Sequence, residues 1–296
     1  MASSGQTRRS LGMSLLIYCG ALLVLLWTLA PLAWMLITSL SPGVELLSSP
    51  PHWIPEQPTF DRYTSIFSAA NLSFRGSEVQ SPSATFVSGL INSVIVAAGT
   101  TLLSLAVGLL AAFAFARLHF RFSRAILFSI VALQMLPSIA TVVPIFALFQ
   151  RVHLTDSVLG LVLADSGPAV TYIIWVMSSY IRTLPAELEE AARIDGASHF
   201  GAYLRITLPL AVPGIVAAGT LSFLLAWNEF LFALVLSSTT ASKTMPVAIS
   251  EFSSRFGLDY GMIMTGGVLA SIPPVLLAMV FQRYLVQGLA GGAVKG

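Results

Sequence analysis

Residues 86–115 read FVSGLINSVIVAAGTTLLSLAVGLLAAFAF, a run without a single charged side chain. A helix needs about 20 apolar residues to cross a bilayer, because each residue rises about 1.5 Å through a hydrocarbon core of about 30 Å. This run is long enough to span a membrane, with residues left for tilt or for turns outside the hydrocarbon. Small residues recur in it at three- and four-residue steps and predict a face for close helix packing. They are Ala97, Thr101, Ser104, Gly108 and Ala111.

The whole chain has the same apolar character. Of its 296 residues, 56% are hydrophobic and 9% are charged, whereas soluble domains carry roughly 25% charged residues. Six spans are predicted, each helical because lipid offers the backbone no hydrogen-bond partner. They lie at about 14–39, 86–115, 125–149, 157–181, 211–236 and 263–286. We therefore expect an all-α membrane protein whose residues 1–296 form a single transmembrane domain.

The distribution of basic residues predicts the orientation of the spans. An even number of spans places both termini on one side, and lysines and arginines gather on the cytoplasmic side. Most of the 15 basic residues fall in segments on the side of the termini, and Arg117, Arg121 and Arg124 form a tight cluster there. Both termini are thus expected in the cytoplasm. The proline-rich segment 41–84 then lies outside, as a loop or with a short amphipathic turn near Pro58 to Phe67.

Several classes of function find no support in the composition. Net charge is only +2, and no basic block with interleaved aromatic residues indicates nucleic-acid binding. Cys19 is the single cysteine, so neither an intramolecular disulfide nor a multi-cysteine metal site is expected. The four histidines lack metal-ligand spacing; they are His52, His119, His153 and His199. No metal site and no catalytic residues are therefore predicted.

The most specific pattern lies between the fourth and fifth predicted spans, in the loop at 182–210. Pro185 suits the first turn of a helix, acidic residues follow it, and Gly196 suits the left-handed turn that ends a helix. A helix of about 11 residues is predicted between them, and Ser198 can cap a second helix that ends near Pro209. The small-residue face of the first helix suits insertion into a groove of a partner protein. The alternative is an amphipathic helix that only covers the end of the helix bundle.

This loop resembles the EAA loop of the membrane subunits of bacterial ABC importers. Glu190-Ala191-Ala192, then Gly196, then Ile206 and Leu208-Pro209 match that pattern at every position. The resemblance implies a coupling helix seated on a separate ATPase subunit. The residues that it assigns to ATPase coupling are Glu190, Ala191, Ala192, Asp195, Gly196, Ile206, Leu208 and Pro209.

The resemblance covers roughly residues 11–296 and is to the MalG-like permeases of carbohydrate importers, in the maltose-transporter permease family. Asn92-Ser93, Gln134 to Pro137 and the end of the chain from Gln282 carry it. It implies a type I importer permease fold in a bacterial inner membrane, a heterodimer with a sister permease, two ATPase subunits and an extracytoplasmic binding protein. The cytoplasmic tail 287–296 would reach toward the ATPases through Gly291, Gly292, Val294, Lys295 and Gly296. A sugar or oligosaccharide is the implied cargo, and glycerol phosphate or polyamine importers have similar membrane subunits.

ATP hydrolysis must come from a partner. A phosphate-binding loop ends in Gly-Lys-Ser/Thr, but Lys243 follows a serine and Lys295 follows a valine, and the chain has no other lysine. We therefore expect a non-catalytic subunit that binds no cofactor itself, with ATP and Mg²⁺ on the ATPase subunits and alternating access driven through the coupling helix.

Polar residues within the predicted spans are candidates for the translocation path. Charge in a span is costly, so Asp165 and Glu229 are expected to face the bundle interior or water. Asn228, Glu229 and Gln134 could border the path, or they could only clamp helices together. A rival reading is an ion- or proton-coupled carrier that uses Asp165 and Glu229 as its relay, although no internal repeat supports it. A membrane scaffold without transport is a third class.

Overall fold

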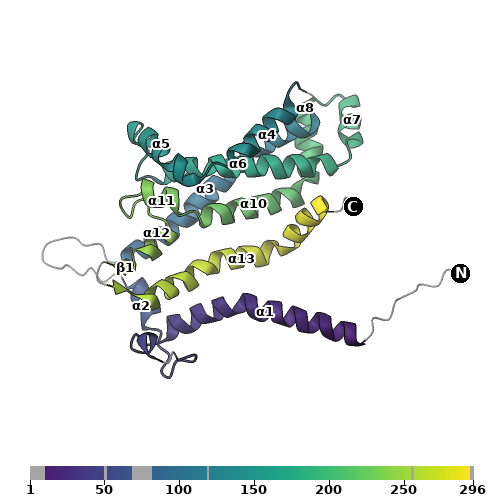
Figure 1. The fold of residues 1–296 in the computed structure, drawn as a ribbon. Helices are drawn as coiled ribbons and strands as arrows, with labels where there is room; N and C mark the ends of the chain where they lie inside the picture. Colours follow the sequence, from purple (N-terminus) through teal and green to yellow (C-terminus); the bar gives the residue numbers. More distant parts are fainter. Residues whose placement is uncertain (1–10, 50–51, 69–81, 119, 255–256, 294–296) are drawn as a thin grey trace. The chain divides into compact units, whose positions relative to one another are not determined.

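A computed structural model of the protein describes residues 11–49, 52–68, 82–118, 120–254 and 257–293, and these are almost entirely helical (Figure 1). Its contacts divide into two compact units. The first comprises residues 1–64 and 253–269, and the second comprises residues 65–252 and 270–296. Each unit is described by itself below.

Helices make up nearly all of the secondary structure of the described residues. In chain order they are α1 (Leu11–Leu40), η1 (Glu45–Leu47), α2 (Asp61–Phe67), α3 (Pro82–Arg117), α4 (Ser123–Leu133), α5 (Ser138–Arg151), α6 (Val158–Thr183), α7 (Glu187–Ile194), α8 (His199–Ala202), η2 (Tyr203–Thr207), α9 (Leu208–Leu210), α10 (Val212–Trp227), α11 (Leu231–Leu236), α12 (Met245–Ser250) and α13 (Tyr260–Ala293). Between α12 and α13, β1 (Ser253–Ser254) and β2 (Gly257–Leu258) form a minimal antiparallel pair. The predicted all-α fold is confirmed, with this pair as a small addition.

Length and hydropathy identify the helices that can cross a membrane. Within the part of the chain that the structure describes, four single helices are long and apolar enough, and they lie within α1, α3, α6 and α13. Two bent pairs bring the number to six if each pair is one span. One pair is α4 with α5, bent by 91°, and the other is His199–Leu210 with α10, bent by 77°.

The bend between α4 and α5 follows directly from the sequence. Pro137 has extended backbone at φ −66° and ψ 133°, and it cannot donate the amide hydrogen bond that would continue the helix. Residues 134–136 close tight turns onto carbonyls three positions back. The span predicted at 125–149 is therefore broken between Gln134 and Pro137.

The fifth predicted span differs from the structure. A continuous helix over 211–236 was expected, but α10 ends at Trp227 and α11 begins at Leu231. Two side chains stabilise the break: the Asn228 amide donates to the Leu224 carbonyl, and the Glu229 carboxylate accepts the amides of Phe232 and Ala233. A polar residue pair that caps two helix ends explains why the apolar run does not stay helical.

The core of the second unit is built from α3, α6 and α10, which lie side by side (Figure 1). The small-residue face predicted for α3 allows this close packing. A Cβ at Gly108 would come within 2.7 Å of the Ile173 side chain in α6, and one at Gly219 of α10 within 3.2 Å of Leu105. Ala97 and Ser104 are fully buried in the same face.

The first unit joins α1 to the segment that follows it and to the start of α13. The Arg62 guanidinium donates to the carbonyls of Ser39 and Ser41, which close the end of α1. The Ser39 and Tyr63 hydroxyls lie 2.6 Å apart, and Met35 packs at Gly267 of α13. The amphipathic turn that was one of two alternatives for residues 58–67 is thus present as the short helix α2.

Candidate coupling site

The helix predicted between Pro185 and Gly196, which is the candidate coupling helix, corresponds to α7, with eight residues from Glu187 to Ile194. It is shorter than the 11 residues expected between Pro185 and Gly196. At its start Ala186 is the cap and gives no side-chain hydrogen bond, and at its end Asp195 has already left helical geometry at ψ 8°. Three acidic residues occupy the first turn and Arg193 the last, which is the favourable arrangement for the helix dipole.

Gly196 ends α7 as predicted, with a positive φ of 93°. The Ala197 amide donates to the Ala192 carbonyl and the Gly196 amide donates to the Arg193 carbonyl. These two bonds form a Schellman motif, in which a left-handed residue turns the chain away from the helix axis. The turn separates α7 from α8, whose first turn is capped by the Ser198 hydroxyl accepting the Gly201 amide at 3.0 Å, also as predicted.

Gly196→Ala tests this turn in isolation. A Cβ at this position would meet no atom within 4 Å, so only the backbone conformation opposes the substitution. Left-handed geometry costs a residue with a side chain about 1–2 kcal/mol, and we expect amide exchange at positions 196 and 197 to accelerate about tenfold. Gly196→Asn, which tolerates this region better, should show a smaller change. Equal protection in all three proteins would mean that the turn does not hold the end of α7.

A buried ion pair ties α7 to the end of α3. The Arg117 Nε donates to the Glu189 Oε1 at 2.8 Å, and both side chains are nearly buried, at 13% and 11% exposure. The same guanidinium donates to the Leu184 carbonyl at 2.9 Å, while Arg182 of α6 donates to the Phe115 carbonyl of α3. The ends of α3 and α6 are therefore cross-linked, and α7 is attached to both.

Arg117 and Glu189 were not predicted as a pair. In the sequence, Arg117 is one of a cluster of three arginines, and Glu189 is one of the acidic residues that follow Pro185. They are separated by 72 positions, and no spacing rule connects residues so far apart.

The opposite side of α7 is uncovered. Leu188 is 46% exposed and Ile194 86% exposed, and Glu190 and Ala191 are exposed as well. Behind α7, Tyr203 is buried in a cluster with Phe113 of α3 and Met177 of α6, and Leu208 packs against that cluster. The site thus has an exposed apolar and acidic face carried on a rigid base.

The remaining predicted coupling residues lie at the end of α7 and in the short helices η2 and α9 that follow α8. Asp195 is exposed beside Gly196, Ile206 is half-buried in the π-helical turn η2, and Pro209 is exposed in α9. Gly291 and Gly292 are in the last turn of α13, so the tail expected from residue 287 continues as helix. Val294, Lys295 and Gly296 lie outside the described residues.

The predicted path residues occupy helix breaks. The Gln134 amide, at the α4–α5 bend, donates to the Pro168 carbonyl of α6 at 2.7 Å. Asn228 and Glu229 lie between α10 and α11, bonded as described above, and Asn228 is exposed. Among the described residues, no hydrogen bond links the side chains of Gln134, Asn228 and Glu229 to one another. Glu229 accepts the amides of Phe232 and Ala233 at 2.8 and 3.0 Å, so its carboxylate stabilises the start of α11.

Asp165 is the other acid in a predicted span. It lies in α6, is 7% exposed, and interacts electrostatically with Glu229. Its Oδ1 finds no hydrogen-bond partner in the described part of the chain. The expectation that Asp165 faces the protein interior is met.

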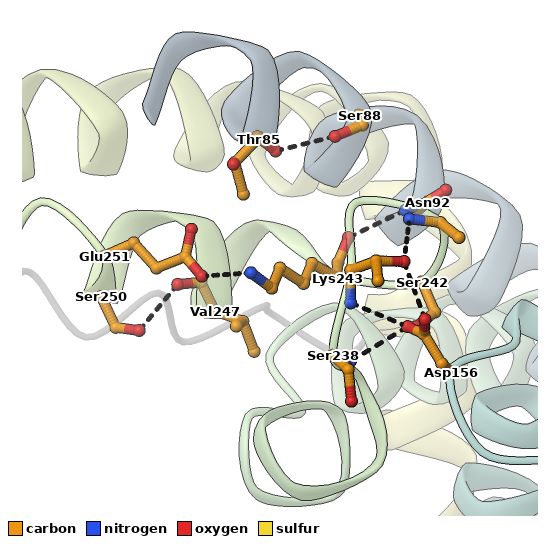
Figure 2. A network of polar contacts seen from close by, with 12 residues as sticks. Thr85, Ser88, Asn92, Asp156, Ser238, Ser242, Lys243, Val247, Ser250 and Glu251 are labelled. Atoms are coloured by element: carbon orange, nitrogen blue, oxygen red, sulfur yellow. Dashed lines mark hydrogen bonds and ion pairs between the residues drawn. The ribbon is translucent and has the colours of Figure 1, made fainter. Parts of the chain in front are cut away.

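A second polar cluster, the Asp156 clamp, joins the α5–α6 connection, the α11–α12 connection and helix α3 of the second unit (Figure 2). Asp156 precedes α6 and accepts the amides of Ser238 and Thr239 and the hydroxyls of Thr239 and Ser242. From α3, the Asn92 amide donates to the carbonyls of Thr240 and Lys243, and the Ser93 hydroxyl accepts the Met245 amide. This clamp explains why Asn92-Ser93 stands at that point of α3.

The charge of Asp156 makes the clamp sensitive to acid. Burial alone would raise the pKa of Asp156, but the amides of Thr239 and Ser238 and the hydroxyls of Ser242 and Thr239 together lower it to about 2. A carboxyl group whose pKa is lowered by folding stabilises the fold above its unfolded pKa of about 4, and this contribution is lost as the pH falls toward about 2.

Asp156→Asn should therefore destabilise the clamp by about 1–2 kcal/mol at neutral pH. The difference from the unchanged protein should shrink between about pH 4 and about pH 2. Thermal unfolding in detergent over this range measures it, with Asp61→Asn, a change at an exposed acid in α2, as the control. A stability difference between Asp156→Asn and the unchanged protein that stays constant down to pH 2 would contradict the conclusion that the Asp156 carboxylate stabilises the clamp.

The chain matches known proteins over most of its length. Residues 104–291 match the family model described as "Binding-protein-dependent transport system inner membrane component". The trehalose transport system permease SugB of Mycobacterium tuberculosis is 37% identical over 276 residues, covering 93% of this chain and 95% of the relative. The trehalose/maltose transport system permease MalG of Thermococcus litoralis is 31% identical, covering 95% and 97%.

Solved structures agree in fold. A bacterial ABC transporter chain involved in import of the acidic polysaccharide alginate superposes with a TM-score of 0.74 at 19% identity, covering 96% of this chain and 99% of that one. A chain of the MetNI methionine ABC transporter gives a TM-score of 0.56 over 69% of this chain. At these identities the likeness concerns the fold alone.

Proposed function

The chain belongs to the family of inner-membrane components of binding-protein-dependent transport systems, and from this premise we propose that α7 seats a separate ATPase subunit. The protein is the non-catalytic, multi-pass permease subunit of an ABC importer. The observation that supports the seat is the two-sided character of α7. Glu189 is bonded inward to Arg117, while Leu188 and Ile194 have no cover among the described residues.

In the proposed mechanism, movement of α7 is transmitted through its contacts with the ends of α3 and α6. When the ATPases close on ATP, α7 would be displaced, and the bonds from Arg117 to Glu189 and to the Leu184 carbonyl would carry that displacement to the ends of α3 and α6. These two helices form the core of the second unit, so their movement would alternate access across the membrane.

The complete assembly that we propose contains this chain, a sister permease, two ATPase subunits that bind ATP and Mg²⁺, and an extracytoplasmic binding protein. Both termini, including Gly291 to Gly296, would lie on the cytoplasmic side with α7. This arrangement fits the excess of basic residues there and the absence of a phosphate-binding loop from the sequence.

We further propose a sugar or glycoside as cargo. The relatives named for their cargo support this class. Two are permeases for trehalose and for trehalose or maltose, and a third is the sulfoquinovosyl glycerol permease of Agrobacterium fabrum, which is 33% identical over 293 residues. Gln134, Asn228 and Glu229 would border the path, with Glu229 acting by holding α11 in position.

Glu229→Gln separates these roles. Glutamine keeps one acceptor oxygen, so we expect α11 to remain folded but less firmly held, with transport reduced about threefold to tenfold by loss of a charge-assisted hydrogen bond. Uptake by the reconstituted complex measures the effect. Unchanged uptake and unchanged sugar-stimulated ATPase activity would remove Glu229 from the path.

Reconstitution of the complete complex tests the function itself. Proteoliposomes that contain this chain with its co-purified partners should accumulate labelled trehalose or maltose only when ATP and the binding protein are both supplied. Uptake driven by an ion gradient without ATP would overturn the proposal, and ATP-driven uptake of a non-sugar solute would overturn only its cargo.

A further inference from the structure

A small pocket with both polar and apolar lining residues lies in the first unit, at the end of α1 where the following segment folds back. Its volume is about 210 Å³. Its polar lining comes from α1, η1, the segment after it and the start of α13. The lining residues are Trp34, Ile37, Thr38, Ser41, Glu45, Leu46, His52, Tyr260 and Met264.

An apolar groove leads from this pocket along α1. It is lined by Trp27, Ala30, Pro31 and Ala33 together with Trp53, and it shares Trp34 and Ile37 with the pocket. From Trp27 to Ile37 the helix rises about 15 Å, which is half of a hydrocarbon core of about 30 Å. The groove thus has the length of one acyl chain in one leaflet, with a polar pocket at the headgroup end.

The chemistry of the pocket favours a cation. Glu45 lines it, and one of the carboxylate oxygens is 3.3 Å from the amide of Glu56. None of the described lining residues is lysine or arginine, and the neighbouring Arg62 guanidinium donates to the carbonyls of Ser39 and Ser41. The Trp34 and Trp53 rings meet edge to face at 5.2 Å at the junction of pocket and groove. Tryptophan at this depth is typical of the membrane interface, and its face attracts ammonium groups.

Polar groups remain for the rest of a headgroup. Thr38 lines the pocket, is 6% exposed, and its hydroxyl has no hydrogen-bond partner among the described residues. His52 and Tyr260 are exposed at the rim and carry N–H and O–H donors that suit phosphate oxygens. An acid, an aromatic pair and neutral donors together fit a zwitterionic headgroup better than an anionic one.

We propose that this pocket and groove bind a phospholipid with an amine headgroup, phosphatidylethanolamine being the simplest. Its ammonium contacts the Glu45 carboxylate, its phosphate lies between His52 and Tyr260, and one acyl chain follows α1 from Ile37 to Trp27. The site requires only that α1 spans a membrane, and it does not depend on the coupling role of α7.

Lipid retention tests the site. The complete transporter is exchanged into nanodiscs that contain equal amounts of phosphatidylethanolamine and phosphatidylglycerol with identical acyl chains. It is then released from the nanodiscs, and the lipids that it retains are identified by native mass spectrometry. We expect phosphatidylethanolamine to be retained preferentially, and Glu45→Gln to lower that preference about fivefold, as loss of a half-buried carboxylate–ammonium contact predicts. Glu56→Gln, an acid of the same segment that does not line the pocket, is the matched control.

A second variant separates headgroup from chain. Ala30→Trp fills the groove and should reduce retention of both lipids while leaving their ratio unchanged. Two results would overturn the proposal. The unchanged protein could retain the two lipids in the same ratio as the nanodisc bilayer, or Glu45→Gln could keep the same preference for phosphatidylethanolamine as the unchanged protein. Either result would mean that only surrounding lipid or a protein partner covers the groove.

Discussion

Arg117→Ala is expected to abolish most ATP-driven transport while the chain remains inserted in the membrane. The substitution leaves the Glu189 carboxylate nearly buried without its ion-pair partner and removes the bond to the Leu184 carbonyl. Breaking one side of a buried pair costs about 3–5 kcal/mol, and the slight exposure of both groups lowers this to about 2–3 kcal/mol here. Because α7 carries few other bonds to α3, we expect α7 to detach rather than the bundle to unfold.

Transport per ATP hydrolysed is the informative quantity, and it should fall at least tenfold. Arg117→Lys keeps the charge but loses the forked geometry that reaches Glu189 and Leu184 together, so it should be intermediate. The double variant Arg117→Ala with Glu189→Gln removes the unpaired charge and should recover part of the loss. Arg121→Ala is the control, since Arg121 belongs to the same basic cluster and its guanidinium lies over the Phe122 ring.

Full coupling in Arg117→Ala would contradict the role of the ion pair. A double variant no better than the single one would show that α7 is held by something other than this pair. Both outcomes are visible in the same proteoliposome experiment, because ATPase activity and uptake are measured together.

Ile194→Asp is expected to release the ATPase subunit without affecting the fold. Ile194 is 86% exposed at the end of α7, so its loss removes almost no contact within the chain. If it is a buried anchor of the ATPase interface, a carboxylate in its place leaves an unpaired charge there and weakens binding by about 2–4 kcal/mol. Co-purified ATPase should fall about thirtyfold or more.

The chain offers a matched control for this substitution. Ile54 is 79% exposed in the segment after α1, which the proposed topology places on the opposite side of the membrane. Ile54→Asp should leave ATPase association unchanged. Loss of association in both variants would point to a general effect of surface charge, and retention in Ile194→Asp would place the ATPase elsewhere.

The position of α7 was predictable because its signals are local. Pro185, the acidic first turn and Gly196 fix where α7 can begin and end, and the Gly196 backbone at φ 93° realises the turn that its lack of a side chain permits. The span positions were predictable for a similar reason, since an apolar run of sufficient length has few alternatives to a helix in lipid.

The parts that were not predicted depend on contacts between distant residues. Asp156 bonds residues more than 80 positions away, and no motif marks it in the sequence. The break after Trp227 was missed because Asn228 and Glu229 sit in an apolar run that reads as helix throughout. Glu229 becomes a cap only when the helix has already stopped. Hydropathy averages over such a break, so the fifth span was drawn too long.

Site-specific photocrosslinking from α7 tests the central claim most directly. A photoreactive amino acid at position 194, introduced in the complete transporter in native membranes, should give an adduct with the ATPase subunit after irradiation, and the same residue at position 54 should not. Absence of an ATPase adduct from position 194, with one formed from position 54, would contradict the assignment of α7 as the coupling helix.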